Sequence, residues 1–171
     1  EISGGAVSVV ALTTLSGQVF EAIQQATSIG KSITAERTPD AKDLTPAITA
    51  AYEAVRHAGF LRALLMPRFM EVLLKVPAEI RRTFVEAAIA TEDLRVLQEF
   101  PLLGFPRECP MILIGSPARC RIFRELLTRA EAAGPVVAEI TAEEAVDRLS
   151  IDGAVAIARR AGWFTGGTHA L

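Results

Sequence analysis

Residues 111–117 read MILIGSP. The first four residues form a short, continuous apolar run, which indicates a buried strand. Ser116 is a natural helix N-cap and Pro117 a natural first helical residue, so a helix is predicted directly after the strand. Apolar side chains recur at helical spacing over residues 122–127 and give this helix one apolar face. The segment therefore predicts a β-turn-α corner.

A second strand and a second helix are predicted after this corner. Val136 to Ile140 reads as a short strand, and Thr141 with Glu144 is typical of a capping box that opens a helix reaching about Ala161. A β-α-β-α order implies parallel strands with helices packed on the faces of the sheet.

The first residues of the chain predict two further strands. The Val-rich segment from Ala6 to Thr14 reads as a buried strand, and Glu1-Ile2 as the tail of an earlier one. Ser3-Gly4-Gly5 would then be a hairpin turn. A natural domain rarely begins inside a hairpin, so we expect this chain to be a segment of a longer protein.

Helices are predicted through the middle of the chain. Their limits are set by apolar periodicity and by glycine or proline at the ends. The predicted helices cover residues 16–29 with Gly30 as C-cap, 46–57 ended by Gly59, 60–75 interrupted near Pro67, and about 77–99. Antiparallel strands, helices and then parallel β-α units place the chain in the α/β class.

Composition excludes several classes of function. Half of the residues are apolar and 22% are charged, which is typical of a globular protein. The net charge is −2 and no long basic run occurs, so nucleic-acid binding is not expected. No apolar stretch is long enough to cross a membrane. The two cysteines form no disulfide framework, which fits a cytoplasmic location. The two histidines and two cysteines have no metal-ligand spacing.

A phosphate-loop reading of Gly30-Lys31-Ser32 fails on two counts. That motif needs a glycine five residues before its second glycine, and Gln25 occupies the position. It also needs a preceding strand, whereas this segment ends a predicted helix. Gly30 as a helix C-cap is the better reading.

The turn at Gly115 and Ser116 is a candidate ligand site. It follows the carboxyl end of a strand, where open α/β sheets bind ligands. Gly115 would let the backbone approach a flat ligand, and free amides at the helix start could meet an anion. An ordinary strand-to-helix cap explains the same residues, and the sequence leaves both readings open.

A similar turn lies between the first predicted strand and helix. Thr14, Ser16 and the free amides near Gly17 could bind a carboxylate or a phosphate. A plain helix cap is again the alternative.

These two turns and the residues between them resemble the 2-dehydro-3-deoxygalactonokinases. The resemblance extends from Ala6 to about Trp163 and corresponds to the second half of the family's sequence. Four segments carry it: Thr14 to Gln18 with Ile29-Gly30 at the far end of the helix; Leu61, Leu64, Leu65 and Arg68; Ile89 and Glu92; and Leu113 to Pro117.

The resemblance implies an actin-like kinase fold, in which two ribonuclease-H-like lobes close over ATP and substrate. Residues 1–164 would be the carboxyl-terminal lobe, with a helical insertion at about 40–100 and a flexible tail at 165–171. The cofactors would be ATP and Mg²⁺, mostly bound by the missing amino-terminal lobe. The phosphoryl acceptor would be 2-dehydro-3-deoxy-galactonate or a related 2-keto-3-deoxy acid.

The resemblance also assigns candidate site residues. The missing lobe would supply the catalytic base and the phosphate-binding loops, so this chain is expected to be inactive alone. The nucleotide would contact Gly115, Ser116 and Pro117, and the substrate side of the cleft would be formed by Thr14, Ser16, Gly17 and Arg68.

Two alternatives remain open from sequence. The chain could be a stand-alone interaction module whose helical middle, residues 46–99, docks a partner, or a catalytically dead relative of the kinases. A homodimer is also possible. An Asp-x-Gly loop encoded about 120 residues before Glu1 would favour the enzyme.

Overall fold

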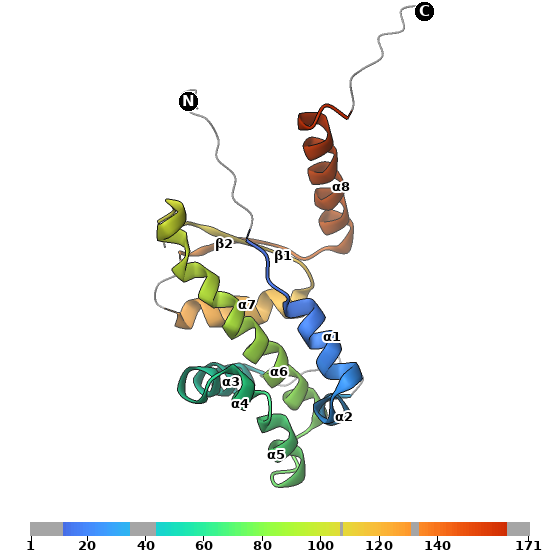
Figure 1. Cartoon of the computed structure of the whole chain (residues 1–171), viewed down its shortest axis with the longest axis vertical. Helices are drawn as coiled ribbons and strands as arrows, with labels where there is room; N and C mark the ends of the chain where they lie inside the picture. Colours follow the sequence, from blue (N-terminus) through green and yellow to red (C-terminus); the bar gives the residue numbers. More distant parts are fainter. Residues whose placement is uncertain (1–11, 35–43, 107, 131–133, 164–171) are drawn as a thin grey trace, which may run out of the picture.

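The computed structural model describes residues 12–34, 44–106, 108–130 and 134–163. These residues form a helix-rich α/β arrangement, with a small sheet between the main group of helices and α8 (Figure 1). The helices are α1 (Ser16–Ala26), α2 (Ser28–Ile33), α3 (Thr45–Ala58), α4 (Phe60–Ala63), α5 (Met66–Val72), α6 (Ala78–Asp93), α7 (Pro117–Arg129) and α8 (Glu143–Arg160). Two 3₁₀ helices, η1 (Leu94–Gln98) and η2 (Phe100–Leu103), and two strands, β1 (Met111–Ile114) and β2 (Val136–Ile140), complete them.

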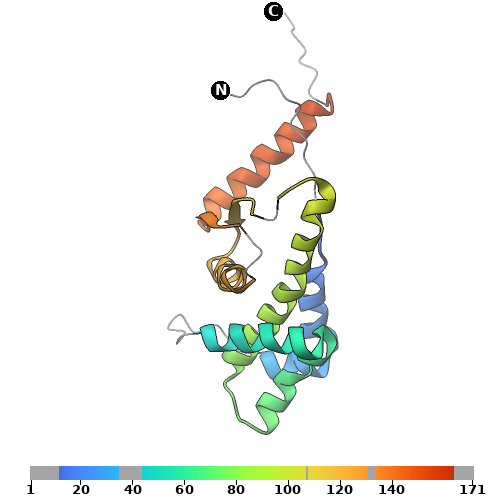
Figure 2. The same ribbon diagram turned by 90° about the vertical axis from the view of Figure 1, so that its left-hand side faces the viewer.

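Helix α6 is the centre of the hydrophobic core. It contacts α1, α2, α3, α5 and α7, and Figure 2 shows α3 crossing it. Ile48, Phe84, Val85 and Leu126, from α3, α6 and α7, belong to one buried cluster. Burial of each such side chain contributes about 1.5–3 kcal/mol. The helical region predicted at about 40–100 therefore shares one core with the segments before and after it.

The predicted β-α-β unit is confirmed. Strands β1 and β2 are parallel, with Met111 opposite Val136 and Ile114 opposite Ile140, and α7 connects them. Helix α7 contacts both strands (Figure 1). The predicted hairpin of residues 1–5 and most of the strand predicted from Ala6 to Thr14 lie outside the described residues, and residues 12–15 have no regular secondary structure.

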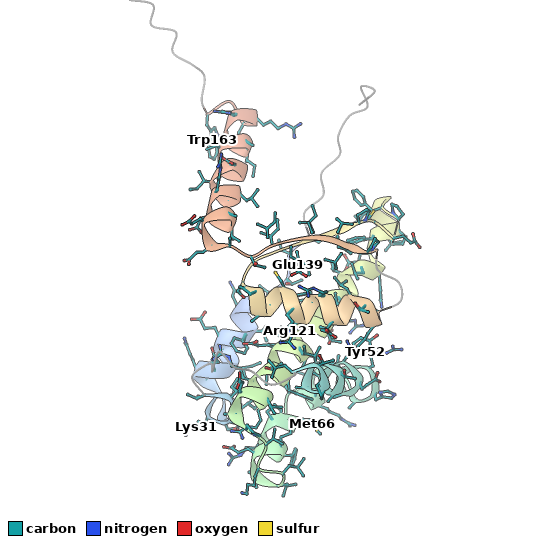
Figure 3. The ribbon with its side chains drawn as sticks, turned by 180° about the vertical axis from the view of Figure 1, so that it is seen from behind. Lys31, Tyr52, Met66, Arg121, Glu139 and Trp163 are labelled. Carbon is teal, nitrogen blue, oxygen red and sulfur yellow. The ribbon has the colours of Figure 1, made fainter. Side chains whose placement is uncertain are left out.

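An ion pair ties α7 to the sheet. Arg124 of α7 binds both carboxylate oxygens of Glu139 on β2, and Figure 3 shows Glu139 between the sheet and the helix. The hydrogen bonds from Arg124 lower the pKa of the Glu139 carboxyl. Cys120 is buried on the same helix, and burial, with the nearby Glu139, raises the pKa of its thiol.

The predicted C-cap at Gly30 is wrong. The first predicted helix breaks at Thr27, whose backbone is extended and whose hydroxyl accepts a hydrogen bond from the Gly30 amide at 3.4 Å. Gly30 therefore lies inside α2. A Cβ there would be 2.1 Å from the backbone oxygen of Gln24, so glycine is needed because α2 packs directly against the end of α1.

The predicted capping box at the last helix is also wrong. Helix α8 begins at Glu143 with Ala142 as its N-cap, and no side chain caps it. Thr141 is one residue too early to reach the first free amides. Glu143 and Glu144 instead lie in the first turn, where their carboxylates interact favourably with the positive end of the helix dipole.

The other helix limits follow the sequence closely. Gly59, with φ of 83°, caps α3 as predicted, and the break near Pro67 separates α4 from α5. The helix that starts after Pro77 was predicted to reach about Glu99, but α6 ends at Asp93 and continues as 3₁₀ helix η1. Such tightening is common where an α-helix ends.

A polar cluster joins α2, α5 and α6. The fully buried Ser32 hydroxyl donates to the Glu71 carboxylate at 2.6 Å, and Arg68 donates to the same oxygen at 2.7 Å. Arg81 lies 3.6 Å from the other Glu71 oxygen and also donates to the Ser32 carbonyl. The Ser32 hydrogen bond, with the Arg68 and Arg81 charges, lowers the pKa of Glu71.

We expect Glu71→Gln to reduce stability at pH 7 more than at pH 3. A pKa lowered by folding stabilises the protein above the unfolded-state value of about 4.3, and this stabilisation is lost as the pH falls through the folded value. Urea denaturation at both pH values measures the effect. Glu99→Gln, the same substitution at an exposed residue, is the control. A deficit for Glu71→Gln that is equal at both pH values would contradict the assignment.

Candidate functional site

The two turns singled out in the sequence meet in the structure. Nη2 of Arg119, in the first turn of α7, donates to Oγ of Ser16, the first residue of α1, at 2.9 Å. These residues are 103 positions apart in the chain. The packing of both α1 and α7 on α6 brings the starts of the two helices together.

Hydroxyl groups occupy this junction. Oγ1 of Thr14 and Oγ of Ser16 are 3.1 Å apart, and Oγ of Ser116 accepts from the Arg119 amide at 3.4 Å. Ser116 and Pro117 are the N-cap and first residue of α7, as predicted. The N-cap of α1 is Leu15, which supplies no side-chain hydrogen bond. The first-turn amides of α1 therefore lack a side-chain acceptor at this position.

A pocket of about 210 Å³ lies between α1, α6 and α7 at the junction. Both predicted turns contribute to it, through Ser16 and Ser116. Its apolar part is lined by Phe20, Ile89, Ala90 and Ile122, and its charged part by Arg82, Glu86 and Arg119. A small apolar pocket with a few converging polar groups is the usual form of a ligand subsite.

Two of the charged groups in the pocket are already paired with each other. Nε of Arg82 donates to the Glu86 carboxylate at 3.0 Å, and its guanidinium lies 5.4 Å from the centre of the Phe20 ring. Arg119 instead bonds the hydroxyl of Ser16. The pocket thus holds two guanidinium groups and one carboxylate, which favours an anionic ligand.

Gly115 leaves the strand-to-helix corner open. Its φ is 147°, which side-chain-bearing residues rarely adopt, and no atom lies within 4 Å of the position of a Cβ. Its amide donates to the Ile140 carbonyl at 3.1 Å and so belongs to the sheet. Gly115 can therefore offer close approach to a ligand, while its own N–H is used. Gly17 is likewise uncrowded, at the second position of α1.

Arg68 is not brought to this pocket. It lies on α5 and forms an ion pair with Glu71 at 2.7 Å, in the cluster that joins α2, α5 and α6. Its assignment to the substrate carboxylate stays a prediction that this geometry does not support. Within the residues that the structure describes, no group of three His, Cys, Asp or Glu side chains could hold a metal ion.

Sequence reasoning missed Arg82 and Arg119. Arg82 and Glu86 are four residues apart on one helix, a spacing common in surface ion pairs. Arg119 carried a usable signal, because a cation in the first turn of a helix is disfavoured by the helix dipole. A cation in the first turn after the Ser116-Pro117 cap does not stabilise the helix through its dipole.

A second, larger pocket of about 540 Å³ lies at the other end of α7. Its polar side chains interact mainly with one another. Arg56 donates to the Tyr52 hydroxyl at 3.0 Å, and Arg95 to the Glu92 carboxylate at 2.8 Å. Because its cationic groups are engaged in this way, the smaller pocket at the two turns is the stronger candidate.

The family model for 2-keto-3-deoxy-galactonokinase matches residues 1–149. The chain belongs to this family. The match confirms the resemblance found in the sequence, and it includes both turns and every residue that lines the smaller pocket. No curated protein and no solved structure matches the chain.

Membership of the 2-keto-3-deoxy-galactonokinase family makes this a chain of a sugar-acid kinase family. Kinases are transferases. Among the described residues, no helix of this family member is long and apolar enough to span a membrane.

Proposed function

We propose that this chain is the carboxyl-terminal lobe of an ATP-dependent kinase for 2-keto-3-deoxy-galactonate or a related 2-keto-3-deoxy acid. The observation that carries the proposal is the meeting of the two turns, joined by the Arg119–Ser16 hydrogen bond, around a pocket that favours anions. The family match supports the reaction class. The proposed lobe is residues 1–164, with a ribonuclease-H-like sheet of which β1 and β2 are the parallel part.

In this proposal the two turns divide the ligands between them. The nucleotide lies against Gly115, Ser116 and Pro117, because the open corner admits a flat group close to the backbone. The sugar acid lies nearer Thr14, Ser16 and Gly17, whose hydroxyls and helix-start amides suit a carboxylate or a sugar hydroxyl. Phosphoryl transfer depends on this kind of positioning and on neutralising charge.

The donor set of the pocket fits phosphate better than Mg²⁺. Magnesium prefers carboxylate oxygens and water, and the pocket's carboxylate, Glu86, is paired with Arg82. ATP and Mg²⁺ are the proposed cofactors, and most of their ligands would come from an amino-terminal lobe. When bound, the metal ion would neutralise phosphate charge; the residues of this chain would bind and orient.

The same pairing supports low activity of the chain alone. A general base must be free to accept the proton of the substrate hydroxyl. Glu86 is the pocket's carboxylate, and it is held by Arg82 at 3.0 Å. We therefore propose that the catalytic base lies in the partner lobe and that this chain supplies one wall of the cleft.

Exposed apolar side chains on the two strands indicate a surface that binds a partner, both in a kinase lobe and in a stand-alone module. Ile112, Ile114 and Val137 on the two strands are each more than half exposed. In the kinase proposal the amino-terminal lobe is the intended partner. A stand-alone interaction module, or a homodimer, is the second candidate that this surface favours.

An assay of ATP consumption tests the proposed function. The natural full-length gene product and this chain are each assayed with a panel of 2-keto-3-deoxy acids, and galactose is the neutral control. We expect turnover by the full-length protein with at least one acid and none by the chain alone. Robust turnover by the chain would contradict its assignment as an incomplete lobe. Absence of turnover by the full-length protein with every acid would contradict the proposed kinase activity.

A further inference from the structure

Arg119 has a role that neither the family match nor the predicted site residues assign. We propose that its guanidinium binds an oxyanion of the ligand, a phosphate or a carboxylate, in the pocket between α1, α6 and α7. The choice between these two sources rests on the proposed function; the binding of an oxyanion does not. In the structure the guanidinium is held across the pocket by the hydroxyl of Ser16.

The partner of the Arg119 side chain differs from those of the arginines that pair with carboxylates. Several arginines of the described residues form ion pairs with a carboxylate: Arg68, Arg81, Arg82, Arg95, Arg124, Arg129 and Arg148. Within the same described residues, the Arg119 side chain contacts no carboxylate, and its hydrogen bond goes to a neutral hydroxyl. One Nη2 donor is used, which leaves further N–H groups of the fork for a ligand.

The position of Arg119 on its helix strengthens the inference. It lies in the first turn of α7, where the positive end of the helix dipole disfavours a cation. An anion in the pocket would reverse that cost, because it would be attracted both by the guanidinium and by the positive end of the helix. The first turns of α1 and α7 contain no acidic residue that would already supply this charge.

Arg82 completes the electrostatics of the subsite. Its guanidinium lines the same pocket, but its charge is balanced by Glu86, so Arg119 carries the excess. A planar guanidinium binds phosphate and carboxylate oxygens in pairs, with charge-assisted hydrogen bonds. The pocket volume of about 210 Å³ is below the range for whole drug-sized ligands, so it would receive one charged group and leave the remainder outside.

The first experiment measures binding of small oxyanions to this chain. Inorganic phosphate and pyruvate are titrated into ¹⁵N-labelled protein, and the Arg119 Nε and Ser16–Gly17 amide signals are followed by NMR. We expect both groups of signals to shift as the anion is added and to reach a plateau at high anion concentration. Arg119→Gln should weaken binding about tenfold to a hundredfold, as expected for losing a hydrogen bond to a charged group. Arg119→Lys should retain an intermediate affinity, because it keeps the charge and loses the fork.

Controls separate this role from general charge and from folding. Arg148→Gln removes the same charge from α8, where the Arg148 side chain is 84% exposed and 3.8 Å from Asp152. It should leave binding unchanged. Arg119 is exposed, so its replacement should not alter the urea midpoint. Ser16→Ala, which removes the tether, should weaken binding several-fold without changing the net charge.

The second experiment identifies the source of the oxyanion. ADP is compared with adenosine, and 2-keto-3-deoxy-galactonate with galactose, in the wild type and in Arg119→Gln. A loss confined to ADP assigns the phosphate, and a loss confined to the sugar acid assigns the carboxylate. If adenosine nucleotides and the sugar acid fail to bind while phosphate still shifts Arg119, the subsite stands and the kinase function fails. Equal affinities in wild type and Arg119→Gln, or no oxyanion binding at all, overturn the proposal.

Discussion

Replacing Leu126 with alanine is expected to lower the free energy of unfolding by about 2–5 kcal/mol. Leu126 is fully buried on α7 and belongs to the cluster that includes Ile48 of α3 and Phe84 of α6. The change removes apolar burial and leaves a cavity where three helices meet, and their backbones cannot all close around it. Urea denaturation followed by far-UV circular dichroism measures the loss.

Leu102→Ala is the matched control for this prediction. Leu102, in η2, is 85% exposed, so the same chemical change should alter stability by about 0.5 kcal/mol or less. Similar losses for both variants would show that Leu126 is not at the junction of α3, α6 and α7. A large loss for Leu126 alone would establish that α7, and with it the Ser116 turn, is held by the core.

Replacing Gly30 with alanine is expected to destabilise the protein by about 3 kcal/mol, the upper end of the range for overpacking. The added Cβ would lie 2.1 Å from the Gln24 oxygen and 2.7 Å from the Ile23 oxygen, and both are backbone atoms. Better helix propensity would offset only about 0.5–1 kcal/mol of this cost. The urea midpoint should fall, and α1 should shift away from α2.

Gly153→Ala tests whether the effect at Gly30 is steric. Gly153 lies inside α8, and no atom is within 4 Å of its Cβ position. Alanine there should stabilise the helix by about 0.5–1 kcal/mol. Opposite signs at the two positions are expected. A stabilising Gly30→Ala would mean that α2 does not pack against the end of α1.

Local signals predicted the elements well where chemistry and position coincide. Ser116-Pro117 opened a helix because a hydroxyl cap and a residue without an amide hydrogen suit its first turn. Gly59 ended another because it tolerates positive φ. The prediction failed at Gly30 because glycine serves close packing as well as turns, and only the neighbouring helix distinguishes the two uses.

The candidate site was predicted in two separate halves. Thr14, Ser16 and Gly17 formed one candidate and the Gly115–Pro117 turn the other, and no local pattern placed them together. Arg119 passed unnoticed because its partner is 103 residues away. Arg68 was chosen for its place in a family motif, but its charge is balanced by Glu71, which approaches from the next turn of the same helix.

The amino-acid sequence by itself determined the family, the α/β class, the parallel β-α-β unit and the two turns. These depend on periodicity, caps and motif order, which are properties of neighbouring residues. Tertiary structure alone decided that the turns share one pocket and that Arg119 enters it. The physical reason is that an apolar helix face requires burial without specifying its partner. The packing of both α1 and α7 on α6 determines that the two turns lie side by side.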